Sequence, residues 1–300
     1  MPIADDLVFW RELPGVGERT LCRLLELARR DGTTLRAVAD FEPDALRHRY
    51  RLSARTVARL SHQRPQHLAR CASIINQLRQ AGALAVAIDS AAYPRRLLAI
   101  EHPPPLLFTL GNRRLLEHPS LAILSSREIA DETLQATLAI VEAALREGLT
   151  IVTGGMKSTH RLAAMAARSM RGARIVVLDR GLLSAFAGDF RTDPFGCGPK
   201  RARFDRSQTV VLSPFRPEDH AAPSHGRRRD QLIAALGTLV FASSARCGGE
   251  TERICMNRLA AGKPVLVWGR GNPDLLRAGA HPVDRHSLPL ALEHFLGPAK

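Results

Sequence analysis

The chain of 300 residues contains 43 Lys and Arg against 29 Asp and Glu, which gives a formal net charge of +14 at pH 7, and 45% of its residues are hydrophobic. This apolar fraction is enough for a packed interior and argues against a disordered chain. We find no apolar run of 18 residues and no secretory leader, so we expect no membrane partner and a cytoplasmic location.

The charge indicates a polyanionic partner. A strongly basic chain attracts polyanions and speeds its encounters with them, which makes nucleic acid the leading candidate. The alternative is a basic surface that reflects genome composition and binds nothing. The five cysteines are odd in number and lack CxxC spacing, so we expect reduced, mostly buried thiols, no disulfide framework, no metal and no cofactor. They are Cys22, Cys71, Cys197, Cys247 and Cys255.

Residues 1–75 are predicted to form a small helical domain of helix-hairpin-helix or SAM-like type. Apolar residues recur at helical spacing from Leu21 to Ala28 and again near Val57 and Leu60. The run Leu13-Pro14-Gly15-Val16-Gly17 is similar to the hairpin of such modules, whose backbone NH groups can face a phosphate. An ordinary turn between two helices, with glycine at positive φ, explains the run equally well.

Residues 76–300 alternate short β-type runs with amphipathic stretches. This alternation predicts an α/β fold, a doubly wound, mostly parallel Rossmann-like sheet. Continuous apolar runs fit strands that are buried on both faces. The expected strands are Leu84 to Ile88, Leu121 to Leu124, Leu149 to Val152, Ile175 to Leu178, Thr209 to Leu212, Leu239 to Ala242 and Pro264 to Trp268.

Between the strands, Thr133 to Glu147 is predicted to be a helix with Leu134, Leu138, Val141 and Leu145 on its buried face. Three segments interrupt the alternation. The proline-rich run Pro103 to Phe108 is expected to be an extended connector, packed on the sheet by Tyr93 and Phe108. The segments 187–205 and 214–229 are expected to be loops.

Three strand-to-helix turns have the composition of phosphate sites, because small residues there let a phosphate approach backbone NH groups at a helix start. The first is Ser125-Ser126-Arg127, whose arginine could clamp the phosphate. The second is Thr153-Gly154-Gly155-Met156-Lys157. The third, Gly248-Gly249, is followed by Glu250 and Glu252, whose charges would repel a phosphate. For Ser126 the alternative is a helix cap, and for Arg127 and Lys157 a solvated surface position.

Arg227-Arg228-Arg229 precede another predicted helix. Three adjacent guanidinium groups repel one another unless a polyanion neutralises them, which favours phosphate contacts over an idle solvated run.

The stretch from Tyr93 to Gly111 closely resembles the Tyr-Pro lead-in of the DprA/Smf family of DNA-processing proteins. It contains Tyr93-Pro94, Leu97-Leu98, Pro103-Pro104-Pro105-Leu106-Leu107-Phe108 and Gly111. The family's later motifs are matched at Ser126, Arg127, Gly154 and Arg229. Ser125 replaces a glycine, Thr153 a serine, His160 an aspartate, and Asp230-Gln231 an Asn-Arg pair.

The resemblance covers about residues 10 to 285 and implies a small helical domain joined to an extended Rossmann fold. It implies a homodimer that binds and protects single-stranded DNA, assists loading of the RecA recombinase in recombination or natural transformation, and has no catalytic residues. We expect no carboxyl-terminal winged helix in this chain.

Two alternatives remain on the same fold. Gly248-Gly249-Glu250-Thr251-Glu252 is similar to a shortened glycine loop of lysine-decarboxylase-like phosphoribohydrolases, in which Glu252 would act as acid or base. A sensor of a small nucleotide is the other.

For a DNA-binding protein of this type we predict weak sequence preference and strong salt dependence, since few aromatic residues are available for base stacking. Replacement of Arg127 by alanine, or joint replacement of Arg227, Arg228 and Arg229, is expected to weaken binding without unfolding the protein.

Overall fold

A computed structural model describes residues 3–126, 130–155, 157–195, 202–269, 272–284 and 286–296 of the chain. In this part of the chain, no helix is both long enough and apolar enough to cross a membrane.

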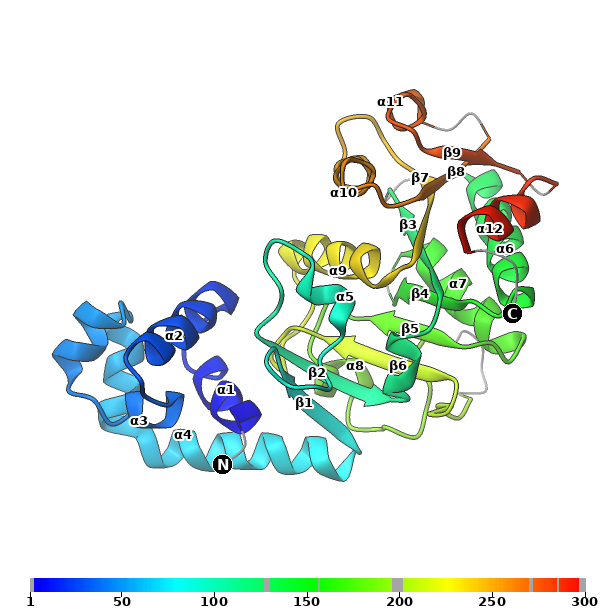
Figure 1. The fold of residues 1–300 in the computed structure, drawn as a ribbon. Helices are drawn as coiled ribbons and strands as arrows, with labels where there is room; N and C mark the ends of the chain where they lie inside the picture. The colour runs from blue at the N-terminus through cyan, green and yellow to red at the C-terminus, as the bar shows by residue number, and fades with distance from the viewer. Residues whose placement is uncertain are drawn as a thin grey trace.

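The amino-terminal part is helical (Figure 1). Its helices are α1 (Ile3–Arg11), α2 (Glu18–Arg30), α3 (Leu35–Val38), the π-helical turn η1 (Ala45–Arg49) and α4 (Ala54–Gln80). As the spacing predicted, α2 buries one apolar face between Leu21 and Ala28. Ser53 caps the start of α4 with its hydroxyl, which accepts the Thr56 N–H, and the helix is kinked at Gln63, just before Pro65.

A nine-stranded sheet follows, in the order β1-β2-β6-β5-β4-β3-β7-β8-β9. Strands β3 to β9 pair in parallel, while β2 is antiparallel to both β1 and β6. The strands are β1 (Ala83–Ala87), β2 (Leu106–Gly111), β3 (Ser120–Ser125), β4 (Thr150–Gly154), β5 (Arg174–Val177), β6 (Thr209–Ser213), β7 (Leu239–Ser244), β8 (Val265–Trp268) and β9 (His281–Val283).

Strand order reverses between β3 and β7. From β3 the chain adds β4, β5 and β6 on one side, and from β7 it adds β8 and β9 on the other. In such sheets the carboxyl ends of the two central strands leave a crevice in which ligands bind.

The sheet is covered on both faces, because successive side chains of each strand point to opposite sides. Leu121 and Ile123 of β3 pack against the layer of α6 (Asp131–Arg146), α7 (Ser158–Ser169) and α12 (Leu288–Leu296). Ala122 and Leu124 face the opposite layer. That layer contains α5 (Arg95–Leu98), η2 (Arg113–Leu116), α9 (Pro223–Leu236), α10 (Glu250–Ala260) and α11 (Pro273–Arg277). The predicted fold class is therefore confirmed.

The amino-terminal helices pack against β1, β2 and α8 (Leu182–Phe186). One apolar cluster joins Leu7 and Trp10 of α1 to Phe108 of β2 and Phe186 of α8. Figure 1 shows α1 and α4 beside β1 and β2. Helix α4 ends at Gln80, and the first strand begins at Ala83. The division of the chain into domains 1–75 and 76–300 stays a prediction.

Each of the seven predicted strands lies within two residues of an observed one, but β2 and β9 were not predicted. The run Pro103 to Phe108 is only partly a connector, because its prolines end before Leu106 and β2 pairs on both sides. Tyr93 and Phe108 do pack on the sheet, and the Tyr93 hydroxyl donates to the Pro104 carbonyl at 2.8 Å.

The prediction of a loop throughout 214–229 was wrong at its end, because α9 begins at Pro223. A proline is well suited to the first turn of a helix, where its missing N–H has no intrahelical partner.

The buried face predicted for α6 was also wrong in part. Ile140, Val141 and Ala144 are buried, whereas Leu138 is 36% exposed. The residues of α6 that are buried are small or β-branched, whereas Leu134 and Leu145 are only partly buried.

Some of the positive charge lies inside the protein. Arg174, 1% exposed, forms an ion pair with the buried Asp193. Arg258 donates to the carbonyls of Ala234, Gly237 and Thr238 at the end of α9, and burial lowers its pKa to about 10. These arginines therefore stabilise the interior and are not available to a partner.

Candidate nucleic-acid interface

A cleft of about 680 Å³ opens at the carboxyl ends of β3 and β7, the point where strand order reverses. Residues from the turns after β3, β4 and β7 and from α9 and α10 line it. They are Ser126, Lys157, Pro223, Gly226, Arg227, Arg229, Asp230, Ser244, Arg246, Gly249, Glu250 and Thr251. The predicted turns thus meet at one edge of the sheet.

The turn after β3 is tied to the turn after β7. The Ser126 N–H donates to the Ser244 carbonyl at 2.8 Å, and the Ser126 hydroxyl accepts the Arg246 N–H at 2.9 Å. Ser125 is fully buried, and its hydroxyl shares a 2.5 Å hydrogen bond with Thr159. Ser126 lines the cleft and Ser125 supports it from below; Arg127 lies outside the described residues.

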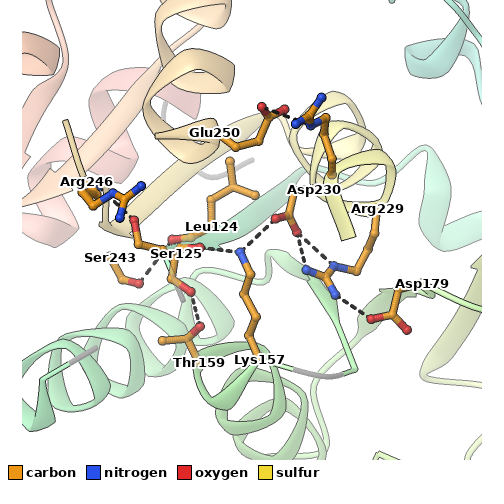
Figure 2. Close-up of polar contacts among 12 residues, drawn as sticks. Leu124, Ser125, Lys157, Thr159, Asp179, Arg229, Asp230, Ser243, Arg246 and Glu250 are labelled. Carbon is orange, nitrogen blue, oxygen red and sulfur yellow. Dashed lines mark hydrogen bonds and ion pairs between the residues drawn. The ribbon is translucent and has the colours of Figure 1, made fainter. Parts of the chain in front are cut away.

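Lys157 connects the turn after β4 to α9. Its ammonium group donates to the Ser125 carbonyl and, at 2.8 Å, to Asp230 (Figure 2). Only 16% of the side chain is exposed. Lys157 therefore reaches the cleft as part of a fixed network and is not a solvated loop lysine.

Arg229 continues this network. It lies 2.8 Å from Asp179 and 2.9 Å from Asp230, and it is 3% exposed. Figure 2 shows the resulting chain of alternating charges from Lys157 through Asp230 and Arg229 to Asp179. Two cations and two carboxylates neutralise one another in this layer.

Each of Arg227, Arg228 and Arg229 has a carboxylate of this chain beside it, so repulsion among them does not by itself require a polyanion, and their phosphate contacts stay a prediction. Arg228 lies 2.6 Å from Glu18 of α2 and does not line the cleft, and Arg227 lies 3.5 Å from Glu250. The three residues also fall in the second turn of α9, past the helix start. The expectation that their joint replacement leaves stability unchanged does not fit the burial of Arg229.

Glycine in the turn after β4 is required by packing. A Cβ on Gly154 would lie 2.7 Å from His160 Nδ1 and 2.9 Å from Arg229 Cδ, and one on Gly155 would lie 3.1 Å from Phe195. The buried Thr153 hydroxyl donates to the His160 carbonyl. None of these three turn residues lines the cleft, and their contact with a phosphate stays a prediction.

The sequence prediction omitted Arg246. This residue follows β7, is exposed and lines the cleft, and its guanidinium group has no hydrogen bond or ion pair with a described residue. Its position two residues beyond the end of a parallel strand was the signal available in the sequence. Arg227 is similarly accessible, with 68% of its side chain exposed.

Carboxylates oppose these cations. Glu250, in the first turn of α10, lines the cleft and is held by Arg253 at 2.6 Å and by Arg227. Asp230 is the second carboxylate in the lining, against four cations. The lining is thus positive overall, and both of its carboxylates are held in ion pairs.

Glu252 is not placed for catalysis in this cleft. It accepts the Gly248 N–H at 2.7 Å and the Asn272 amide at 2.6 Å, and it does not line the cleft. Gly249 lies in the lining, whereas Gly248, at φ +70°, only shapes the turn. Ligand atoms of Cys247, Glu252 and Asp274 lie within 4.8 Å of one another, a grouping that the sequence did not predict.

His160 lies beneath the cleft and is fully buried. Burial, followed by the charges of Arg229 and Lys157, holds its pKa well below the ordinary value. Its imidazole is therefore neutral at pH 7 and adds no charge to the site.

The hairpin between α1 and α2 has the features of an ordinary helix–helix turn. Gly15 has φ +78°, and the Thr56 hydroxyl donates to the Pro14 carbonyl at 2.7 Å. Arg216, from the segment after β6, donates to the carbonyls of Arg11, Leu13 and Val16. The hairpin therefore serves as an attachment point for the α/β part.

A doubly wound, mostly parallel sheet with a cleft at its point of strand reversal defines a Rossmann-like α/β protein, the class in which ligands bind at that point. Residues 85–283 match the family model of DNA recombination-mediator protein A. The chain belongs to this family, which confirms the resemblance to DprA/Smf proteins.

Curated relatives agree with this assignment. The chain is 27% identical over 191 residues to DNA processing protein DprA of Streptococcus pneumoniae, a match that covers 63% of this chain and 64% of the relative. It is 28% identical over 170 residues to protein Smf of Synechocystis, covering 52% and 38%. The matches thus span less than two thirds of each relative.

Solved structures show the same fold. The X-ray structure of DprA from Streptococcus pneumoniae superposes with a TM-score of 0.65 at 20% identity and covers 97% of this chain and 98% of that one. DprA from Helicobacter pylori, described for its single-stranded DNA binding mode, gives a TM-score of 0.56 at 17% identity and covers 71% and 98%.

Proposed function

We propose that this protein binds single-stranded DNA as a recombination mediator, with the cleft between β3 and β7 as its binding site. The observation that carries the proposal is the pair Arg227 and Arg246. Both are exposed on the cleft, and the guanidinium group of Arg246 has no partner among the described residues. Guanidinium groups of this kind can each hold a backbone phosphate with two hydrogen bonds.

Lys157 and Arg229 support such a site without being its main contacts. Because Asp230 and Asp179 hold them in place, they give the floor of the cleft a fixed shape. A phosphate between the two outer arginines would lie above this floor. The family and the Helicobacter pylori structure favour DNA as the source of the phosphate.

We further propose a homodimer, assistance of RecA loading and a cytoplasmic location, all from the family resemblance. Size-exclusion chromatography coupled to light scattering tests the dimer, and RecA strand exchange on protein-coated DNA tests the assistance. The phosphoribohydrolase alternative gains no support from a cleft that Glu252 does not line.

The experiment that tests DNA binding compares Arg227→Ala/Arg246→Ala with a matched variant, Arg113→Ala/Arg114→Ala. The matched pair lies in η2, ahead of β3 and so at the opposite edge of the sheet, and its loss changes the net charge equally. Fluorescence anisotropy with a single-stranded oligonucleotide should show about tenfold weaker binding for the cleft variant only. Equal affinities of the cleft variant, the matched variant and the parent would reject the cleft.

A further inference from the structure

A second hollow, of about 780 Å³, lies along α4. Its walls are α4, Pro14 of the hairpin and residues 216–220 after β6. We call it the α4 groove. It is separate from the cleft, since no residue lines both.

Basic side chains line the α4 groove on both sides of the kink at Gln63. Arg55, Arg59 and His62 are spaced by four and three residues, which places them on one face of the helix. Arg70 follows beyond the kink. Neither Arg55 nor Arg59 forms an ion pair with a described residue, although Arg59 donates to Gln63.

Arg216 adds charge from the opposite wall. Its guanidinium group donates to three backbone carbonyls, which are neutral, and it forms no ion pair with a described residue. Its N–H donors therefore have acceptors, but no carboxylate pairs with its positive charge among the described residues. An anion in the groove would experience its field.

Two acidic residues of the groove have partners within it, and the four arginines of the lining outnumber them. Glu218 lies 2.6 Å from Arg70, and Asp219 accepts the Arg216 N–H at 3.1 Å. Burial raises the pKa of Glu12, so its charge is disfavoured there. Positive charge dominates the groove, which suits an extended anion.

The groove also lies close to the cleft. His220 lines the α4 groove and Pro223 lines the cleft. Three residues of chain span no more than about 11 Å. One extended polyanion could therefore contact both.

We propose that the α4 groove is a second nucleic-acid-binding site, which holds the phosphate backbone of the strand that occupies the cleft. This proposal rests on the proposed DNA binding and extends it to the amino-terminal helices. It predicts that the groove contributes only to strands long enough to leave the cleft.

The test compares Arg55→Ala/Arg59→Ala with the parent, with the matched variant Arg113→Ala/Arg114→Ala and with the cleft variant. Each protein is titrated with single-stranded oligonucleotides of about 6 and about 30 nucleotides. Since Arg55 is exposed and Arg59 partly so, and since alanine favours helix, all variants should melt like the parent.

The groove variant should bind the short oligonucleotide like the parent and the long one about tenfold more weakly. For the long strand, the slope of log Kd against log salt should fall by about 1.4, the value for two lost phosphate contacts. Arg55→Lys/Arg59→Lys should restore most of that slope, because a contact that depends on charge survives the change.

Two results would overturn the proposal. One is parental affinity of the groove variant for the long strand; the other is an equal loss in the matched variant, which would assign the effect to net charge. An acidic protein segment as the occupant would give the first result. The cleft variant decides the proposed function separately, because it should lose binding of both oligonucleotides whatever the groove does.

Discussion

Arg229 lies 2.8 Å from Asp179, and both side chains are almost completely buried. The pair joins the second turn of α9 to the end of β5, and Asp230 completes it at 2.9 Å. Arg229, which the sequence assigned to phosphate contacts, is thus a buried structural residue of the cleft floor.

Arg229→Ala should destabilise the protein by about 3 to 5 kcal/mol, because it leaves two buried carboxylates without their shared cation. Urea unfolding at pH 7 measures the change. Arg227→Ala, at an exposed site two residues before Arg229, should cost no more than about 0.5 kcal/mol. Similar losses for the two variants would show that the buried pair does not contribute in this way.

Glu250→Gln should tighten binding of single-stranded DNA. The substitution removes a carboxylate that lines the cleft and competes for Arg227. Removal of one partly exposed negative charge beside the bound strand should raise the affinity roughly fivefold at low salt. Anisotropy titrations measure it, with Glu142→Gln on α6 as the matched charge change. A Glu250 variant that binds no more tightly than the Glu142 variant contradicts the expectation.

Gly154→Ala should cost about 1 to 3 kcal/mol, since its Cβ would overlap His160 and Arg229. Gly226→Ala should instead stabilise α9 by about 0.5 to 1 kcal/mol, because its Cβ meets only one atom, at 3.8 Å. Thermal unfolding of both variants provides the comparison. A stabilising Gly154→Ala would mean that the turn has room for a side chain.

Stability should fall as the pH drops below about 6.5, the ordinary pKa of histidine. The pKa of His160 and that of His67 are both lowered, chiefly by burial. The unfolded chain therefore takes up protons that the folded protein does not, at up to about 1.4 kcal/mol per pH unit for each histidine.

Raised carboxyl pKa values, as at Glu12, act in the opposite direction, so single variants isolate the histidine effect. His160→Gln should reduce the difference in free energy of unfolding between pH 7.5 and 5.5, whatever its effect at pH 7.5. His62→Gln, at an exposed position, should leave the difference unchanged. An unchanged difference in His160→Gln would show that this imidazole is protonated in the folded protein.

The α/β class, seven of the nine strands and the meeting of three turns at one sheet edge could be predicted from the sequence. Each depends on the spacing of apolar and small residues along a short stretch of chain. Strand β2 was not predicted, because the prolines before Leu106 indicate a connector and only pairing with β1 and β6 makes the segment a strand. The buried face of α6 depended in the same way on the surface that covers it.

Local spacing thus determined where the backbone turns and which cations approach the sheet edge. Only the tertiary structure decided which of those cations remain accessible. Arg229 is neutralised by Asp179, 50 residues away, and Arg228 by Glu18, 210 residues away, while the guanidinium group of Arg246 remains without a partner among the described residues. Ion pairing depends on distances of a few ångströms between segments that the fold brings together, and no pattern within a short stretch of sequence contains those distances.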